Sequence, residues 1–168
     1  EITRLTDLSV KCCERLRDAD TRTRDGVAIH LHANAELPGD VAQARSFGAA
    51  GIGLYRTEFL FLQRKDAPGE EEQFLAYRDL GLGMGGLPVT IRTLDLGADK
   101  QVDSGARMGP TPNNPALGLR AIRLCLKEPE LFRTQVRALL RASRFGEMKI
   151  MLLMISSVAE YRQAHSFM

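Results

Sequence analysis

Two short runs of the sequence each combine an arginine, a threonine and a carboxylate in a pattern that could bind an anion. The first run, 56–58 (RTE), follows the apolar residues 51–55, and the second, 92–95 (RTLD), follows the apolar residues 88–91. In parallel α/β folds, ligands bind at the carboxyl ends of the strands, which is where both arginines are expected to lie. Two converging guanidinium groups would form an anion clamp, and phosphate is the anion that best uses their planar forks.

A structural role is the alternative interpretation of these two arginines. In that case Arg56 and Arg92 would each pair with Glu58 or Asp95 in a salt bridge at the end of a strand. Residue types and spacing alone do not decide between phosphate binding and such a salt bridge.

The elements that must position these arginines alternate between strands and helices along the chain. Short apolar runs predict four strands, at residues 28–34, 52–56, 89–93 and 150–155. The spacing of apolar residues predicts helices at 1–18, 41–47, 70–77, 116–126, 129–144 and 157–163. Strands this apolar are typical of a parallel sheet that is covered by helices. We expect the strands to be adjacent in chain order, with Arg56 and Arg92 at the same edge.

Two α/β architectures contain four such units of strand and helix. One is a small, open, doubly wound sheet, and the other is half of an eight-stranded (β/α)8 barrel. A complete barrel typically needs about 250 residues, whereas this chain has 168. Length alone therefore favours the open sheet.

The composition is that of a soluble globular protein, with 44% hydrophobic and 26% charged residues. No apolar run approaches the roughly 20 residues of a membrane-spanning helix, and a net charge of +2 does not indicate nucleic-acid binding. The three cysteines include no Cys-x-x-Cys pair, which favours a reducing compartment. We expect a cytoplasmic protein that binds neither nucleic acid nor membranes.

Two other patterns are interpreted as structural. The glycine-rich run 81–86 precedes its strand, whereas a nucleotide-binding loop would follow one, so we predict a connector there. His30 and His32 share a face of the first predicted strand, but no third metal ligand is identifiable. We therefore predict partly buried or helix-covered histidines at these positions.

Several longer runs together resemble one known family. They are 51–62 (GIGLYRTEFLFL), 70–77 (EEEQFLAY), 91–100 (IRTLDLGADK), 114–123 (NPALGLRAIR) and 137–145 (RALLRASRF). In this order they resemble the phosphoenolpyruvate-binding domain of enzyme I, the phosphoenolpyruvate-protein phosphotransferase of the bacterial sugar phosphotransferase system. Phosphoenolpyruvate synthase and pyruvate phosphate dikinase resemble the chain around residues 56–58, but we do not expect the second and third runs in them.

The resemblance implies a partial TIM (β/α)8 barrel, which reverses the preference based on length. It extends over about residues 25–162, and it implies a linker helix and connector at 1–24, followed at 25–168 by the amino-terminal half of a phosphoenolpyruvate-binding barrel. It also implies that the chain is an incomplete piece of such a protein, containing the first four or so βα units. The tail 164–168 matches no segment of the family pattern.

The resemblance also implies which residues touch the substrate. Arg56 and Arg92 match the arginines that hold the phosphate of phosphoenolpyruvate, and Arg120 matches a basic residue that supports them. The carboxylates that hold Mg²⁺ and the cysteine that protonates the enolpyruvate belong to later strands, and Cys125 does not match that cysteine. We therefore expect no catalytic residue and no metal ligand in this chain. Leu153 stands where the family pattern has proline, which predicts a displaced loop.

The implied parent activity transfers phosphate from phosphoenolpyruvate to a histidine of the same protein and on to a histidine-carrier phosphoprotein during sugar uptake. Its cofactor would be Mg²⁺, and the parent enzyme would be a homodimer. By itself this chain is predicted to be inactive. Two alternatives remain: a catalytically dead remnant that acts as a binding or oligomerisation module, and a part of a fused multiphosphoryl transfer protein.

Overall fold

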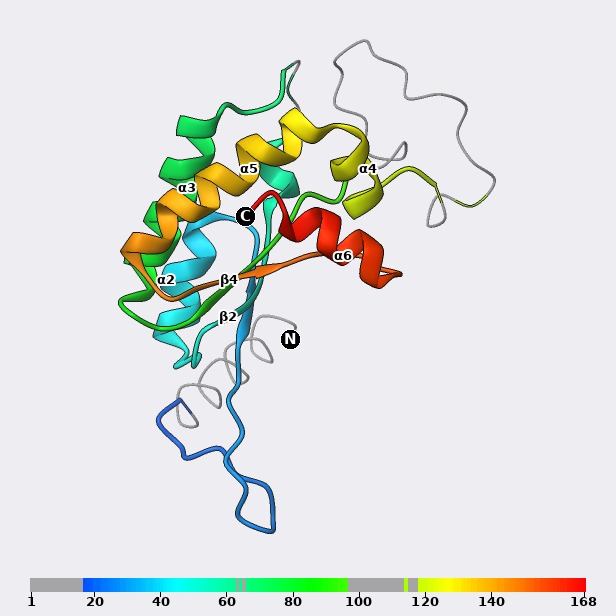
Figure 1. Cartoon of the computed structure of the whole chain (residues 1–168). Helices are drawn as coiled ribbons and strands as arrows, with labels where there is room; N and C mark the ends of the chain where they lie inside the picture. The colour runs from blue at the N-terminus through cyan, green and yellow to red at the C-terminus, as the bar shows by residue number, and fades with distance from the viewer. Residues whose placement is uncertain (1–16, 63, 65, 97–113, 115–117) are drawn as a thin grey trace.

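The computed structural model describes residues 17–62, 64, 66–96, 114 and 118–168 (Figure 1). Most of the helix predicted at 1–18 lies outside these residues, and so do Asp99 and Lys100 of the third family run. Residues 17–32 form an exposed arm that extends away from the helices. In this arm Arg22 and Ala28 form an antiparallel bridge.

Four parallel strands form one sheet in the order β1, β2, β3, β4. Their bounds are β1 Ala33–Ala35, β2 Ile52–Arg56, β3 Val89–Arg92 and β4 Met148–Met151. The predicted parallel sheet with its strand order is therefore confirmed. The α/β alternation is consistent with a partial TIM barrel, as the resemblance implied.

The first and last strands differ from their predicted bounds. β1 begins at Ala33 instead of residue 28, because Ile29 donates its backbone N–H back to Thr21 within the arm. β4 covers Met148–Met151 instead of 150–155, and the backbone turns into the left-handed region at Met154, where φ is 63°. A non-glycine residue with such a φ cannot continue a strand.

Three helices cover one face of the sheet: α2 (Pro38–Ser46), α3 (Glu70–Met84) and α5 (Pro129–Ala142) (Figure 1). Acidic residues occupy the first turn of α3 and proline starts α5, which favours a helix amino terminus in both cases. The main core lies between these helices and the sheet. Its buried side chains include Ile52, Val89, Ile91, Tyr77, Leu80, Met84 and Leu139.

The predicted glycine connector at 81–86 is corrected by the structure, because α3 continues through Gly81 and Gly83 to Met84. A Cβ at Gly81 would lie 2.6 Å from Met148 Cε, and one at Gly83 would lie 2.9 Å from Val41 Cγ1. These glycines therefore allow close helix packing. The helix ends at Gly85, which adopts the left-handed conformation with φ 60°.

A second core lies on the other side of the fold, between α4 (Ala121–Lys127), α5 and α6 (Val158–His165) (Figure 1). Phe132 of α5 meets Phe167 edge to face, with ring centroids 5.3 Å apart. Within the tail at 164–168, Phe167 thus packs against this core and Ala164 is fully buried, whereas His165, Ser166 and Met168 are exposed. α6 starts with a capping box formed by Ser157 and Glu160.

Helix α4 begins at Ala121 and not at residue 116 as predicted. Arg120 precedes it in an extended conformation, and Ala121 has a φ of 48°, so residues 118–120 do not continue the helix backwards. The short 3-10 helices η1 (Thr57–Leu60) and η3 (Ser143–Phe145) follow β2 and α5.

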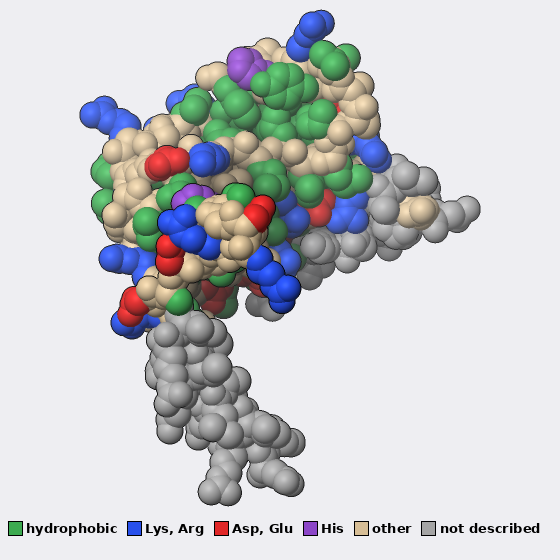
Figure 2. Space-filling view, turned by 90° about the horizontal axis from the view of Figure 1, so that it is seen from below, with side chains coloured by type: hydrophobic (Ala, Val, Ile, Leu, Met, Phe, Trp, Pro, Cys, Tyr) green, Lys and Arg blue, Asp and Glu red, His purple; other side chains and the backbone are tan. Residues whose placement is uncertain are grey.

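On the face shown in Figure 2, apolar side chains gather in the upper part of the view, and charged side chains of both signs lie mainly around and below them. Of the helices within the described residues, none has the length and apolar character needed to cross a membrane.

Candidate functional site

Arg56 and Arg92 lie side by side at the carboxyl edge of the sheet. They are register partners across β2 and β3, and the last register pair across β1 and β2 is Ala35 with Tyr55. Neighbouring strands are about 4.8 Å apart. The prediction that both arginines reach the same edge is therefore confirmed.

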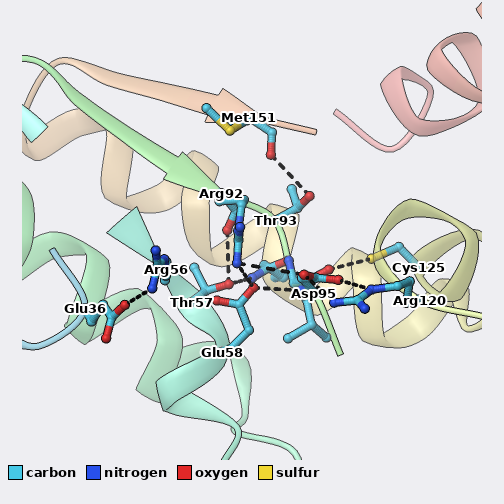
Figure 3. A network of polar contacts seen from close by, with 12 residues as sticks. Glu36, Arg56, Thr57, Glu58, Arg92, Thr93, Asp95, Arg120, Cys125 and Met151 are labelled. Carbon is cyan, nitrogen blue, oxygen red and sulfur yellow. Dashed lines mark hydrogen bonds and ion pairs between the residues drawn. The ribbon is translucent and has the colours of Figure 1, made fainter. Parts of the chain in front are cut away.

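The side chain of Arg56 turns towards Glu36, which follows β1 directly (Figure 3). Its Nη1 donates a hydrogen bond to Glu36 Oε1, and the two side chains are 42% and 31% exposed. The loop that holds Glu36 is fixed by Asp40, whose Oδ2 accepts from the backbone N–H groups of Leu37 and Glu36, each at 2.8 Å. These backbone hydrogen bonds lower the pKa of Asp40.

The side chain of Arg92 points away from Glu36 and into a buried acidic pair (Figure 3). Its Nη2 donates to Glu58 Oε1 at 2.8 Å and lies 3.9 Å from Asp95 Oδ2. The same Glu58 oxygen accepts the backbone N–H of Asp95 at 3.1 Å. The side chains of Arg92 and Glu58 are only 15% and 3% exposed, so this ion pair is largely shielded from water.

Arg120 joins this buried group through Asp95. Its Nε and Nη2 donate to the two carboxylate oxygens of Asp95, both at 2.9 Å, which is the bidentate geometry that suits a guanidinium group. Arg92 and Arg120 thus share Asp95 as a neighbour. Two buried polar atoms have no hydrogen-bond partner among the described residues, Arg92 Nε and Glu58 Oε2.

The structural alternative from the sequence is therefore present at Arg92, which pairs with Glu58 and approaches Asp95. At Arg56 a salt bridge is also present, but the predicted partner is wrong, because Arg56 pairs with Glu36 and not with Glu58 or Asp95. Sequence reasoning missed Glu36, although its position directly after the first strand was an available signal. It also missed Gln135, which lies in the middle of α5 and is 1% exposed.

Cys125 lies in α4 beside this group, fully buried, with its Sγ 3.9 Å from the carbonyl oxygen of Leu94 (Figure 3). Burial raises the pKa of the Cys125 thiol to about 12. A thiol of this kind is inert as a nucleophile at neutral pH.

The described residues contain no group of three or more His, Cys, Asp or Glu side chains placed to hold a metal ion. The two carboxylates closest to the arginines, Glu58 and Asp95, are engaged by guanidinium groups. This part of the chain therefore does not fit a Mg²⁺ ion. His30 and His32 are both exposed in the arm before β1, so the prediction that they are partly buried or covered by a helix is wrong.

The fold and this site define the class to which the chain belongs. The model of the family described as PEP-utilising enzyme, PEP-binding domain, matches residues 11–168, and the chain belongs to this family. The match includes the tail at 164–168, which corrects the expectation that it lies outside the family pattern.

Within this class, the chain is similar to proteins named phosphoenolpyruvate-protein phosphotransferase, which confirms the resemblance to enzyme I. It is 51% identical over 157 residues to the protein from Cupriavidus necator, with 93% of this chain and 27% of the relative covered. It is 50% identical over 155 residues to the protein from Staphylococcus aureus (92% and 27% covered) and 51% identical over 148 residues to that from Geobacillus stearothermophilus (88% and 25% covered). The chain thus spans about a quarter of the length of these curated relatives.

Proposed function

We propose that this chain binds the phosphate group of phosphoenolpyruvate at the carboxyl edge of its sheet, through Arg56 and Arg92 with support from Arg120. The observation that carries the proposal is the register pairing of Arg56 with Arg92, in a chain that belongs to a phosphoenolpyruvate-binding family. Two arginine side chains that start from one register position of neighbouring strands suit the several oxygens of a phosphate once they turn towards it.

The charges of the site suggest how a phosphate would enter. The three arginines are balanced by the three carboxylates Glu36, Glu58 and Asp95. A phosphate dianion therefore has to exchange with a carboxylate. Arg56 is the arginine whose carboxylate partner is most exposed, so exchange is easiest there.

In the whole protein, this site would serve transfer of phosphate from phosphoenolpyruvate to a histidine and then to a histidine-carrier phosphoprotein, in the cytoplasm and as part of sugar uptake. Arginines aimed at the phosphoryl group would offset its charge as it departs. Mg²⁺ would be held by residues outside the described part of this chain. We expect the chain alone to produce no pyruvate, because these arginines by themselves supply neither the Mg²⁺ ion nor the proton donor that the reaction requires.

The proposal is tested by calorimetric titration of phosphoenolpyruvate into the 168-residue chain and its variants. Each charge-assisted contact is worth about 1.5–3 kcal/mol, so Arg56→Ala and Arg92→Ala should each weaken binding about tenfold to a hundredfold. Arg137→Ala is the matched control, because Arg137 is 65% exposed on α5 and pairs with Glu70. Its affinity should equal that of the unchanged chain.

Undiminished binding in both site variants would place the anion elsewhere. Absence of binding in the unchanged chain would favour the alternative of an inert oligomerisation module, which light scattering would reveal as a stable assembly.

A further inference from the structure

Gln135 is a polar side chain among the otherwise apolar buried residues of α5, with Phe132 before it in the chain and Val136 and Leu139 after it. It is 1% exposed. Its amide oxygen nevertheless accepts one hydrogen bond, and its NH₂ group donates two. Oε1 accepts the backbone N–H of Leu94 at 3.0 Å. Nε2 donates to Thr57 Oγ1 and to Tyr77 OH, both at 3.2 Å.

The direction of these hydrogen bonds is set by the partners. A backbone N–H can only donate, so the amide oxygen of Gln135 must face Leu94, which leaves the NH₂ group for the two hydroxyls. The Thr57 hydroxyl in turn donates a hydrogen bond to the carbonyl oxygen of Arg92 at 3.0 Å. The Tyr77 hydroxyl donates a hydrogen bond to Gln73 Oε1 at 3.1 Å. Every hydroxyl therefore accepts one hydrogen bond and donates one.

These partners are the neighbours of the arginine site in the chain. Thr57 directly follows Arg56, and Leu94 lies between Arg92 and Asp95. Gln135 contacts both segments, so a single side chain from α5 ties the end of β2 to the end of β3. No atom of Gln135 contacts a guanidinium group in these hydrogen bonds, so its effect on the arginines is indirect.

The network is anchored at its far end in α3. Gln73, which is fully buried, donates from Nε2 to the carbonyl oxygen of Pro68 at 2.9 Å. Tyr77 is also fully buried, and this burial raises the pKa of its hydroxyl, so it stays protonated as a donor. The anchor therefore connects α3 and α5 to the strand ends through directional bonds instead of apolar contact alone.

We propose that Gln135 is a positioning residue for phosphate binding: it holds the ends of β2 and β3 in the register that brings Arg56 and Arg92 together. This inference rests on the proposed function. An apolar side chain of equal size would fill the same space, but it would leave the Leu94 N–H without an acceptor and the Thr57 and Tyr77 hydroxyls without the hydrogen bond that each accepts from Gln135. The strand ends could then shift, and small displacements of binding groups carry large losses.

The test compares Gln135→Met with Leu139→Ala in the 168-residue chain. Gln135→Met keeps the volume and removes the amide, whereas Leu139→Ala damages the same helix at a buried core position that the network does not include. Both variants should melt at a lower temperature than the unchanged chain. Only Gln135→Met should weaken phosphoenolpyruvate binding, by tenfold or more, while Leu139→Ala should bind within about twofold of the unchanged chain.

Gln135→Glu is the conservative variant. Its carboxylate keeps an acceptor for the Leu94 N–H but cannot donate to Thr57 and Tyr77 when ionised. We expect its affinity to fall between those of the unchanged chain and Gln135→Met. Equal affinity of Gln135→Met and the unchanged chain would overturn the inference.

A second measurement decides the positioning role without a ligand. Amide hydrogen exchange at Leu94 should speed up in Gln135→Met relative to Ile91 of the same strand, and should not do so in Leu139→Ala. Unchanged protection of Leu94 would overturn the inference. If the unchanged chain binds no phosphoenolpyruvate but Leu94 loses protection in Gln135→Met, the proposed function fails while the positioning of the strand ends stands.

Discussion

Arg56 and Arg92 are register partners in neighbouring strands, yet their ion pairs differ in exposure to water. The Arg56 pair with Glu36 is about a third to two-fifths exposed, whereas the Arg92 pair with Glu58 is nearly closed to water. Exposed ion pairs contribute about 0–1 kcal/mol, and removing one partner of a buried pair costs about 3–5 kcal/mol. The difference indicates that Arg56 is the cation available for exchange and that Arg92 is the fixed part of the site.

The elements around each arginine explain this difference. Glu36 lies in the loop between β1 and α2, and β1 is an edge strand of the sheet that the structure describes. Glu58 lies in η1, next to β3, where Asp95 and Arg120 extend the ion pair into a group of four charges. Arg92 is therefore held by more partners than Arg56.

The largest expected effect tests how well the surroundings of Arg92 are closed to solvent, and it uses Cys125, whose Sγ lies 3.9 Å from the carbonyl oxygen of Leu94. Burial raises the pKa of the Cys125 thiol from 9.0 to about 12. At pH 8 the fraction of Cys125 in the thiolate form should therefore be roughly a thousandfold lower in the native chain than in the unfolded chain. Reaction with a chromogenic disulfide reagent should then require unfolding, and native reactivity should rise only as the pH approaches 12. Cys12→Ser with Cys13→Ser leaves Cys125 as the single thiol to be followed.

Fast labelling of native Cys125 at pH 8 would contradict this expectation. It would mean that the region around Leu94 opens often, and the contrast between the two arginines would be smaller than the exposures indicate.

The next largest effect is expected from the carboxylates. Glu58→Gln leaves the buried charge of Arg92 partly uncompensated, so it should lower the free energy of unfolding by about 3 kcal/mol. Glu36→Gln is the matched control at the exposed pair, and it should change this free energy by less than about 1 kcal/mol. Urea denaturation of both variants measures the two values. Equal losses of unfolding free energy in the two variants would contradict the distinction between the buried Arg92 pair and the exposed Arg56 pair.

The smallest predicted effect is a gain in binding. Glu36→Gln removes the carboxylate that competes for Arg56, so phosphoenolpyruvate should bind severalfold more tightly, in line with the worth of an exposed ion pair of about 1 kcal/mol. Loss of fold cannot produce tighter binding, which makes this variant informative. Calorimetry in low salt gives the clearest result, since salt screens exposed charges. Weaker binding in Glu36→Gln would show that Glu36 orders Arg56 instead of competing for the ligand.

The sequence predicted the strands that carry the arginines well. β2 matches its predicted bounds and β3 ends one residue earlier than predicted. The prediction succeeded because short, largely apolar runs are typical of parallel strands buried between layers. The arginine at the end of each run then had only one edge of the sheet to occupy. Predicting Arg120 as part of the site depended on family resemblance, because no periodicity brings residue 120 to Asp95.

Contacts between distant segments decided the rest. Gly81 and Gly83 look like a connector in the sequence, and only the neighbouring Met148 and Val41 explain why a helix carries them. The partner of Arg56 depended on which strand lies beside β2, and Gln135 depends on partners 41 and 78 residues away along the chain. The sequence by itself determined where the strands lie and which cations end them, since local apolar runs and residue types suffice for that. Only the tertiary structure decided which carboxylate each arginine meets and which buried amide holds the strand ends, because hydrogen bonds and ion pairs between distant residues leave no local pattern.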